Sequence, residues 1–201
     1  MKNLITVLLL IPLFSFSQIY TLEEDATRQQ FVDAVWLPGT IIDNNGQVLE
    51  GQVRGYVYKG NEVQSFRYRT EKGAKAVTYK ADDCQQVVYD GLIVISLPKN
   101  FKKPQGKKQF YVCLYHGKNF SVLQDPKASI AGSSSLNFGQ MLNFLGLKNN
   151  QLYKISKLNF KKQIKKILSD NKEWLKKTND KKWFKYNNIF DIAAYYDETS
   201  E

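Results

Sequence analysis

Four aspartates are the residues whose type and spacing come closest to a hydrolytic site. Asp82 and Asp83 could serve as general acid and base, as in glycosidases, or as a corner of a calcium site. Asp90 and Asp125 are further candidate members of this carboxylate set. Adjacent residues on an extended chain point apart, however, and a turn between strands explains the Asp82-Asp83 pair more simply. A polymer-degrading hydrolase that uses these carboxylates is therefore an alternative hypothesis only.

The single histidine, His116, lacks the companions that catalysis or metal binding would need. A general base requires a nucleophile and an orienting carboxylate, and a metal requires several ligands. The setting Tyr115-His116-Gly117 indicates a hairpin tip instead, and Ser133 to Ser135 lack the Gly-x-Ser-x-Gly elbow of a hydrolase nucleophile. The sequence also has no glycine-rich phosphate loop, Cys-x-x-Cys pair or histidine cluster. We therefore expect a non-enzymatic protein with no catalytic residue, cofactor or metal.

Cys84 and Cys113 are the only cysteines of the chain. Two cysteines in an exported protein permit a disulfide, which would close a loop of about 30 residues and contribute roughly 3 kcal/mol if unstrained. The alternative is a pair of small buried side chains on separate strands, since the alignment of their Cβ vectors cannot be deduced from sequence. The sequence leaves both interpretations open.

Positive charge is concentrated in residues 148–185, which hold 13 lysines and no arginine against Asp170, Glu173 and Asp180. Lysines interleaved with aromatic residues could bind lipopolysaccharide, an acidic polysaccharide or nucleic acid outside the cell. The alternative is a solvated face of amphipathic helices, which is the more frequent meaning of a charge run. The candidate surface comprises Lys161, Lys162, Lys165, Lys166, Lys172, Lys176, Lys177, Trp174 and Trp183.

Residues 1–17 have the three parts of a secretory signal peptide: a basic start at Lys2, an apolar core, and small residues before the cut. The apolar core, Leu4 to Phe16, has 13 residues, well below the roughly 18 to 20 that span a bilayer as a helix. Cleavage is expected between Ser17 and Gln18. No later segment is apolar for long enough to span a membrane, so we expect no transmembrane span in the mature chain.

Residues 18–130 are predicted to form a β-rich domain. Asn44-Asn45-Gly46 lies between two β-rich runs, and Asn-Gly readily adopts the positive φ of a hairpin turn. Further short strands with Gly-containing turns follow, including a buried strand from Leu92 to Leu97 that Pro98 ends. This pattern predicts an antiparallel sheet that forms a sandwich or a partial barrel, within an α+β fold class.

The remaining chain is predicted to divide into a connection over 131–150, where a Gly-Ser run lies, and a helical part over 151–201 that packs on the β domain. Leu152 to Ile155 is expected to be one last strand. Phe160, Ile164, Ile167 and Leu168 then follow the spacing of an amphipathic helix covered with lysines. A second short helix is expected around Trp174 and Leu175, and a third from about Asn188 to Tyr196.

The chain resembles a class of exported proteins of Bacteroidota, particularly flavobacteria, to which no activity is assigned. The resemblance rests on the ending Phe14-Ser15-Phe16-Ser17-Gln18, the Gly-rich hairpin, the Leu152-Tyr153-Lys154 strand and the Lys-rich C-terminal helices. It implies export to the periplasm, the outer-membrane periphery or the exterior. We expect a non-enzymatic envelope or secreted protein that binds another envelope component, either a protein or an anionic envelope polymer.

Overall fold

The computed structural model describes residues 35–58, 62–100, 103, 105–126, 144–177 and 183–200. The predicted signal peptide, its cleavage point between Ser17 and Gln18, and the serine run 133–135 lie outside the described residues.

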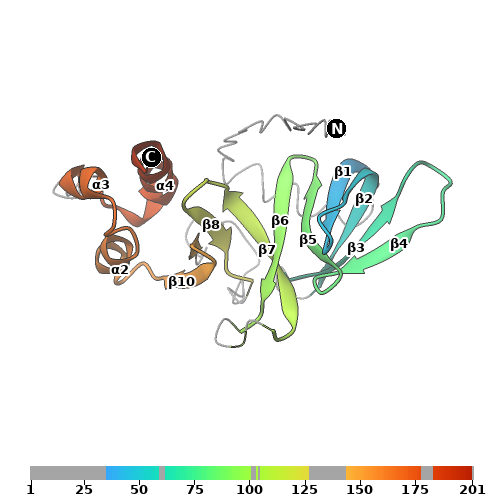
Figure 1. Ribbon diagram of the computed structural model, residues 1–201, viewed down its shortest axis with the longest axis horizontal. Helices are drawn as coiled ribbons and strands as arrows, with labels where there is room; N and C mark the ends of the chain where they lie inside the picture. Colours follow the sequence, from blue (N-terminus) through green and yellow to red (C-terminus); the bar gives the residue numbers. More distant parts are fainter. Residues whose placement is uncertain are drawn as a thin grey trace, which may run out of the picture.

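Ten strands form one antiparallel sheet (Figure 1). The strands are β1 (Leu37–Asp43), β2 (Val48–Tyr58), β3 (Glu62–Arg69), β4 (Val77–Lys80), β5 (Cys84–Tyr89), β6 (Leu92–Pro98), β7 (Lys108–Tyr115), β8 (Ser121–Gln124), β9 (Phe144–Lys148) and β10 (Gln151–Ile155). Their order is β10-β9-β8-β7-β6-β5-β1-β2-β3-β4, with β10 and β4 at the edges. The predicted antiparallel β-rich fold is thus confirmed, and the sheet is open rather than closed.

The hairpin between β1 and β2 follows the turn chemistry of its sequence. Asp43 Oδ1 accepts hydrogen bonds of 2.8 Å from the backbone N–H groups of Asn45 and Gln47. Gly46 has φ +80°, a conformation that costs glycine little. The turn sets the register in which Ile42 pairs with Val48, so the hairpin predicted at Asn44-Asn45-Gly46 is confirmed.

Neighbours in the sheet are also consecutive in the chain, except where β1 pairs with β5. The sheet curls enough for β3 to contact β7, although four strands (β6, β5, β1 and β2) lie between them in the sheet order. Phe66 of β3 is fully buried there, with its ring centroid 4.9 Å from that of Phe110 and 5.3 Å from that of Tyr89. The inner face of the curled sheet therefore forms one end of the main core.

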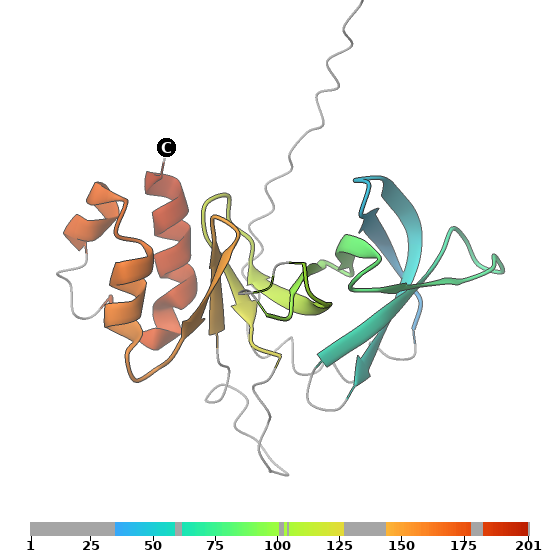
Figure 2. The same cartoon turned by 60° about the horizontal axis from the view of Figure 1, so that its bottom comes forward.

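Three α-helices and a short 3₁₀ turn complete the core at the other end of the sheet. These are α2 (Phe160–Ile167), α3 (Lys172–Lys177), η2 (Tyr186–Asn188) and α4 (Ile189–Thr199). They lie beside β8 and β10, whereas β1–β4 lie at the far end of the molecule (Figures 1 and 2). Phe120 packs on Tyr196, and Phe144 on Phe190, which joins both parts into one core cluster. No helix within the described ranges is long and apolar enough to cross a membrane.

The predicted connection over 131–150 is wrong at its C-terminal end, because residues 144–148 form β9. Phe144 packs in the main core, whereas Leu145 belongs to a second cluster on the opposite face of the sheet. Gly146 lets the strand pass the ring of Phe120, which a Cβ would approach to 2.7 Å. Strands β9 and β10 are therefore the last two strands of the sheet and carry the helices.

Candidate functional site

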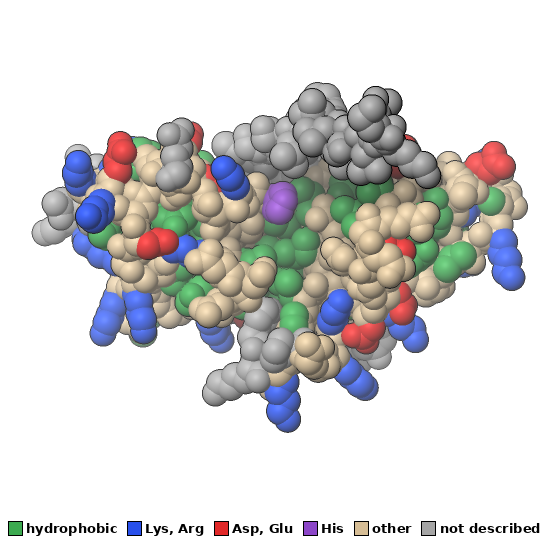
Figure 3. Space-filling model, viewed as in Figure 1, with side chains coloured by type: hydrophobic (Ala, Val, Ile, Leu, Met, Phe, Trp, Pro, Cys, Tyr) green, Lys and Arg blue, Asp and Glu red, His purple; other side chains and the backbone are tan. Residues whose placement is uncertain are grey.

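The lysines of α2 lie on the side of the helix that faces away from the core. Phe160, Ile164 and Ile167 are buried, as the helical spacing predicted. Their neighbours Lys161, Lys162 and Lys166 are exposed, and Lys165 is half-buried. Lys172, Lys176 and Lys177 of α3 are also exposed. Basic side chains, which are all lysines in this part of the sequence, project from the helical end of the molecule in the space-filling view (Figure 3).

Aromatic rings beneath these lysines hold several of the ammonium groups in place. Lys177 Nζ lies 3.9 Å from the ring centroid of Tyr195 and 5.0 Å from that of Trp183. Lys161 and Lys165 lie 5.6 and 5.7 Å from the ring of Phe184. Such contacts contribute about 0.5–1 kcal/mol at exposed sites. We call this set the lysine surface: Lys161, Lys162, Lys165, Lys166, Lys172, Lys176, Lys177 and Trp183.

Trp174 does not belong to the lysine surface, which corrects the sequence-based candidate set. Its side chain is fully buried and packs edge-on against Phe184 and Tyr196. Its Nε1 is buried without a hydrogen-bond partner among the described residues. Because Trp174 is the apolar anchor of the short α3, it positions the lysines instead of offering a contact to a partner.

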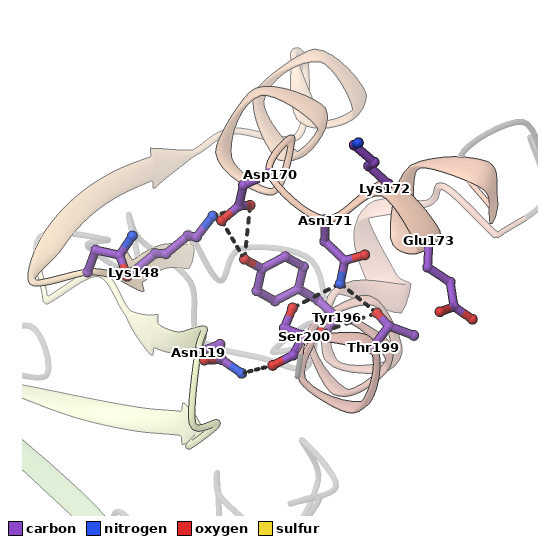
Figure 4. Close-up of a pocket in the computed structure, with 10 residues that line it drawn as sticks. Asn119, Lys148, Asp170, Asn171, Lys172, Glu173, Tyr196, Thr199 and Ser200 are labelled. Atoms are coloured by element: carbon purple, nitrogen blue, oxygen red, sulfur yellow. Dashed lines mark hydrogen bonds and ion pairs between the residues drawn. The ribbon is translucent and has the colours of Figure 1, made fainter.

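A polar pocket of about 420 Å³ opens where the β9–β10 turn, the α2–α3 link and the end of α4 meet (Figure 4). Its lining includes charged groups of both signs and several amides and hydroxyls: Asn119, Lys148, Asn149, Asp170, Asn171, Lys172, Glu173, Tyr196, Thr199 and Ser200. The pocket borders the lysine surface, because Lys172 belongs to both.

Lys148 is buried and forms an ion pair with the exposed Asp170 at the edge of this pocket. Only 7% of its side chain is exposed, and its Nζ lies 2.5 Å from Asp170 Oδ1 and 2.9 Å from the carbonyl oxygen of Ile167 at the end of α2. Tyr196 donates from its hydroxyl to the same carboxylate, at 3.0 Å. Burial alone would lower the pKa of Lys148 and raise that of Asp170, but the hydrogen bonds among the three groups outweigh it and reverse both directions.

Beside this pair, Asn171 in the α2–α3 link forms hydrogen bonds to the start of α3 and to the C-terminal end of α4. Its Oδ1 accepts a hydrogen bond of 2.8 Å from the backbone N–H of Trp174, at the start of α3. Its Nδ2 donates to the hydroxyls of Thr199 and Ser200, at 2.8 and 2.9 Å. The polar side chains of the pocket are therefore largely engaged with one another, which suits a structural joint better than a reaction centre.

Asp197 fixes α4 to the β7–β8 hairpin. Its Oδ1 accepts from the backbone N–H groups of Asn119 and Phe120, at 2.7 and 3.1 Å, and its Oδ2 accepts from the Tyr115 hydroxyl at 2.9 Å. Burial and the neighbouring Asp197 carboxylate raise the pKa of Tyr115. Gly117 passes directly over this carboxylate, since a Cβ built there would overlap Asp197 Oδ2.

Two of the four carboxylates of the alternative hydrolase hypothesis accept hydrogen bonds from backbone N–H groups. Asp82 Oδ1 accepts from the backbone N–H of Lys108, and Asp83 Oδ2 accepts from that of Lys80. Asp90 has φ +48° in the turn between β5 and β6. None of these three, nor Asp125, lines the polar pocket. Within the described part of the chain, no group of three or more His, Cys, Asp or Glu could hold a metal ion.

Cys84 and Cys113 are both buried and both free. Side chains alternate along β7, so Cys113 lies in the second cluster with Tyr111, whereas Cys84 of β5 lies in the main core. A disulfide between them is therefore not formed, because the two thiols belong to opposite faces of the sheet. Burial raises the pKa of Cys84 to about 11 and that of Cys113 to about 12.

His116 is exposed just beyond the end of β7, in the segment that leads to β8, which agrees with the predicted hairpin tip. Its Nδ1 lies 3.5 Å from Ser121 Oγ.

The sequence interpretation missed Lys148, Asp170 and Asn171 as a group. The available signal was the pair Asp170-Asn171 directly after the amphipathic run, which is typical of a helix stop followed by a cap.

The chain has no match among protein-family models, curated proteins or solved structures.

Proposed function

We propose that this chain is an exported, non-enzymatic binding protein whose lysine surface holds an anionic envelope polymer, such as lipopolysaccharide or an acidic glycan. The observation that carries the proposal is the array on α2 and α3, where seven lysines share one end of the molecule. The ammonium groups of three of these lysines lie over aromatic rings, those of Phe184, Trp183 and Tyr195. A solvated face alone would not require that placement.

The spacing of these lysines favours a polymer with repeated negative charge. Lys161 and Lys165 form one row along α2, and Lys162 and Lys166 a second, with a step of about 6 Å within each row. Ammonium groups are point charges without a fixed fork, so they attract anions with little selectivity for geometry. Affinity for such a partner should come from the number of contacts and should fall steeply with salt.

Export and origin are part of the same proposal. The signal-peptide pattern of residues 1–17 and the resemblance to exported proteins of Bacteroidota support a location in the periplasm, at the outer-membrane periphery or outside the cell. The non-enzymatic part is supported by the polar pocket, where Lys148, Asp170 and Asn171 hold helices together and are engaged with one another.

Binding of the purified protein to lipopolysaccharide and to an acidic polysaccharide at low and high salt tests the proposal. We expect binding at low salt that is lost when Lys161, Lys162, Lys165 and Lys166 are changed to Gln. A matched control variant changes four exposed lysines of the β-rich part, Lys72, Lys75, Lys99 and Lys103, to Gln. The proposal fails if the two variants bind equally well or if the wild type does not bind at low salt.

A further inference from the structure

Leu158 is the most exposed large apolar residue in the described part of the chain. It is 92% exposed, whereas Val48, Val77 and Val35 are 56, 51 and 46% exposed. Every other leucine within the described ranges is buried or half-buried. Leu158 lies in the short connection between β10 and α2, directly before the helix that carries the first lysines of the lysine surface (Figure 1).

The connection holds Leu158 outward from the core. On either side of it, Ile155 and Phe160 are buried in the main core cluster. Ser156 donates from its backbone N–H and its hydroxyl to Gln163 Oε1, at 2.8 and 3.3 Å, which fastens the connection to α2. A residue in the position of Leu158, just before the N-cap, commonly packs against the fourth residue of the helix in a hydrophobic staple. In α2 that fourth residue is the polar Gln163, so Leu158 stays in solvent.

All charged residues near Leu158 in the sequence are lysines. Residues 151–169 contain six lysines and no Asp or Glu. The four that flank Leu158 are exposed: Lys154, Lys157, Lys161 and Lys162. The last two lie in the first turn of α2, which has no acidic residue and where the helix dipole disfavours positive charge. The exposed leucine and its lysines therefore fit contact with a partner better than they fit the stability of the folded chain.

We propose that Leu158, with Lys154, Lys157, Lys161 and Lys162, docks on the surface of an anionic lipid bilayer. The leucine side chain enters the boundary between headgroups and acyl chains, while the lysine ammonium groups stay among the negatively charged headgroups. A hydrated acidic polysaccharide offers the lysines the same charge but leaves Leu158 in water. The inference rests on the proposed function, because the lysines of α2 supply the charge in both, and it adds a partner that presents acyl chains as well as anions.

Sedimentation of the purified protein with lipid vesicles tests the proposal. We expect binding to vesicles of equal parts phosphatidylglycerol and phosphatidylcholine and none to phosphatidylcholine alone, because each lysine near an anionic surface strengthens binding about fivefold. Leu158→Ser should weaken binding to the anionic vesicles about tenfold or more, since burial of a leucine side chain changes an equilibrium constant by at least about that factor. The matched control is Val48→Ser on β2, at the far end of the molecule, which should bind as the wild type does.

A fluorophore that responds to polarity, attached to Leu158→Cys, reports insertion directly. The native Cys84 and Cys113 are both buried, so the reagent attaches at the introduced thiol. We expect the emission to shift to shorter wavelength when the anionic vesicles are added. The same fluorophore on Lys72→Cys, in the exposed link between β3 and β4, should show no shift.

Binding of an acidic polysaccharide separates this inference from the proposed function. Leu158→Ser should keep the thermal midpoint and the polysaccharide binding of the wild type, because the replaced side chain lies in solvent. The variant with Lys161, Lys162, Lys165 and Lys166 changed to Gln should lose both partners. Polysaccharide binding without vesicle binding, or equal vesicle binding by the wild type and Leu158→Ser, would overturn the lipid inference alone. A wild type that binds neither partner at low salt would overturn both.

Discussion

The Tyr115 hydroxyl, at the end of β7, donates a hydrogen bond of 2.9 Å to the carboxylate of Asp197 on α4. The same carboxylate accepts from the backbone of Asn119 and Phe120, so one side chain joins the β7–β8 hairpin to the last helix. Helix α4, on which α3 of the lysine surface packs, is therefore held to the sheet by a contact between residues 82 positions apart in the chain.

Replacing Asp197 by Ala should destabilise the protein by about 2–4 kcal/mol, because three donors lose their acceptor at once. Tyr115→Phe removes one of these hydrogen bonds and should cost about 1 kcal/mol. Urea unfolding measures both, with the exposed Glu198→Gln as the control beside Asp197. Equal stability of Asp197→Ala and the control would show that the three hydrogen bonds to Asp197 contribute nothing to the stability of the protein.

Gly117→Ala should also destabilise the protein, by about 2 kcal/mol or more, since the added methyl group must displace the Asp197 carboxylate or the nearby Phe120 carbonyl oxygen. The neighbouring exposed Lys118→Ala is the control and should change stability by less than about 0.5 kcal/mol. A Gly117→Ala variant as stable as Lys118→Ala would contradict the tight approach of the hairpin to α4.

Asp170 should give the protein a stability contribution that depends on acid pH. Its pKa is lower in the folded state than the unfolded value of about 3.9. The contribution is therefore present above that unfolded value and is lost as pH falls through the folded-state pKa. We expect the free energy of unfolding of the wild type to exceed that of Asp170→Asn by about 0.5–1 kcal/mol near neutral pH, because solvent screens a carboxylate that is 58% exposed. The difference should shrink below about pH 4.

Urea unfolding between neutral pH and pH 2 measures this difference, and the exposed Asp191→Asn on α4 is the control. A difference in the free energy of unfolding between wild type and Asp170→Asn that grows as pH falls would contradict the expected contribution of this ion pair.

Both thiols should be unreactive in the folded protein. Their raised pKa values and burial keep Cys84 and Cys113 protonated and covered near neutral pH. A thiol reagent should therefore label neither residue until the protein unfolds, and then both. Dithiothreitol should leave the thermal midpoint unchanged. A single thiol or none after unfolding without reductant, or a lower midpoint with dithiothreitol, would indicate an oxidised pair instead.

Local patterns predicted the elements that short-range chemistry determines. The turn at Gly46 and the buried stripe of α2 follow from backbone preference and from helical spacing, and both are present. The strand expected from Leu152 to Ile155 is part of β10. In each case the residues that decide the structure are within a few positions of one another.

Long-range relations could not be predicted in the same way. Nothing in the sequence of β1 indicates that it pairs with β5 as well as with β2. The separation of Cys84 from Cys113 depends on the alternation of side chains on strands whose pairing was unknown. Trp174 lies among lysines in the sequence, as a surface aromatic residue would. Only the packing of α3 on α4 shows that its side chain is buried.

Acetylation footprinting of lysines, with and without bound acidic polysaccharide, shows whether the lysine surface is the place where an anionic polymer binds. Mass spectrometry reports each lysine separately, so the exposed residues of α2 and α3 can be compared with those of the β-rich part in one sample. We expect protection of Lys161, Lys162, Lys166, Lys176 and Lys177 and unchanged labelling of Lys72, Lys75, Lys99 and Lys103. Protection spread evenly over both groups, or confined to the second, would contradict the lysine surface as the place where an anionic polymer binds.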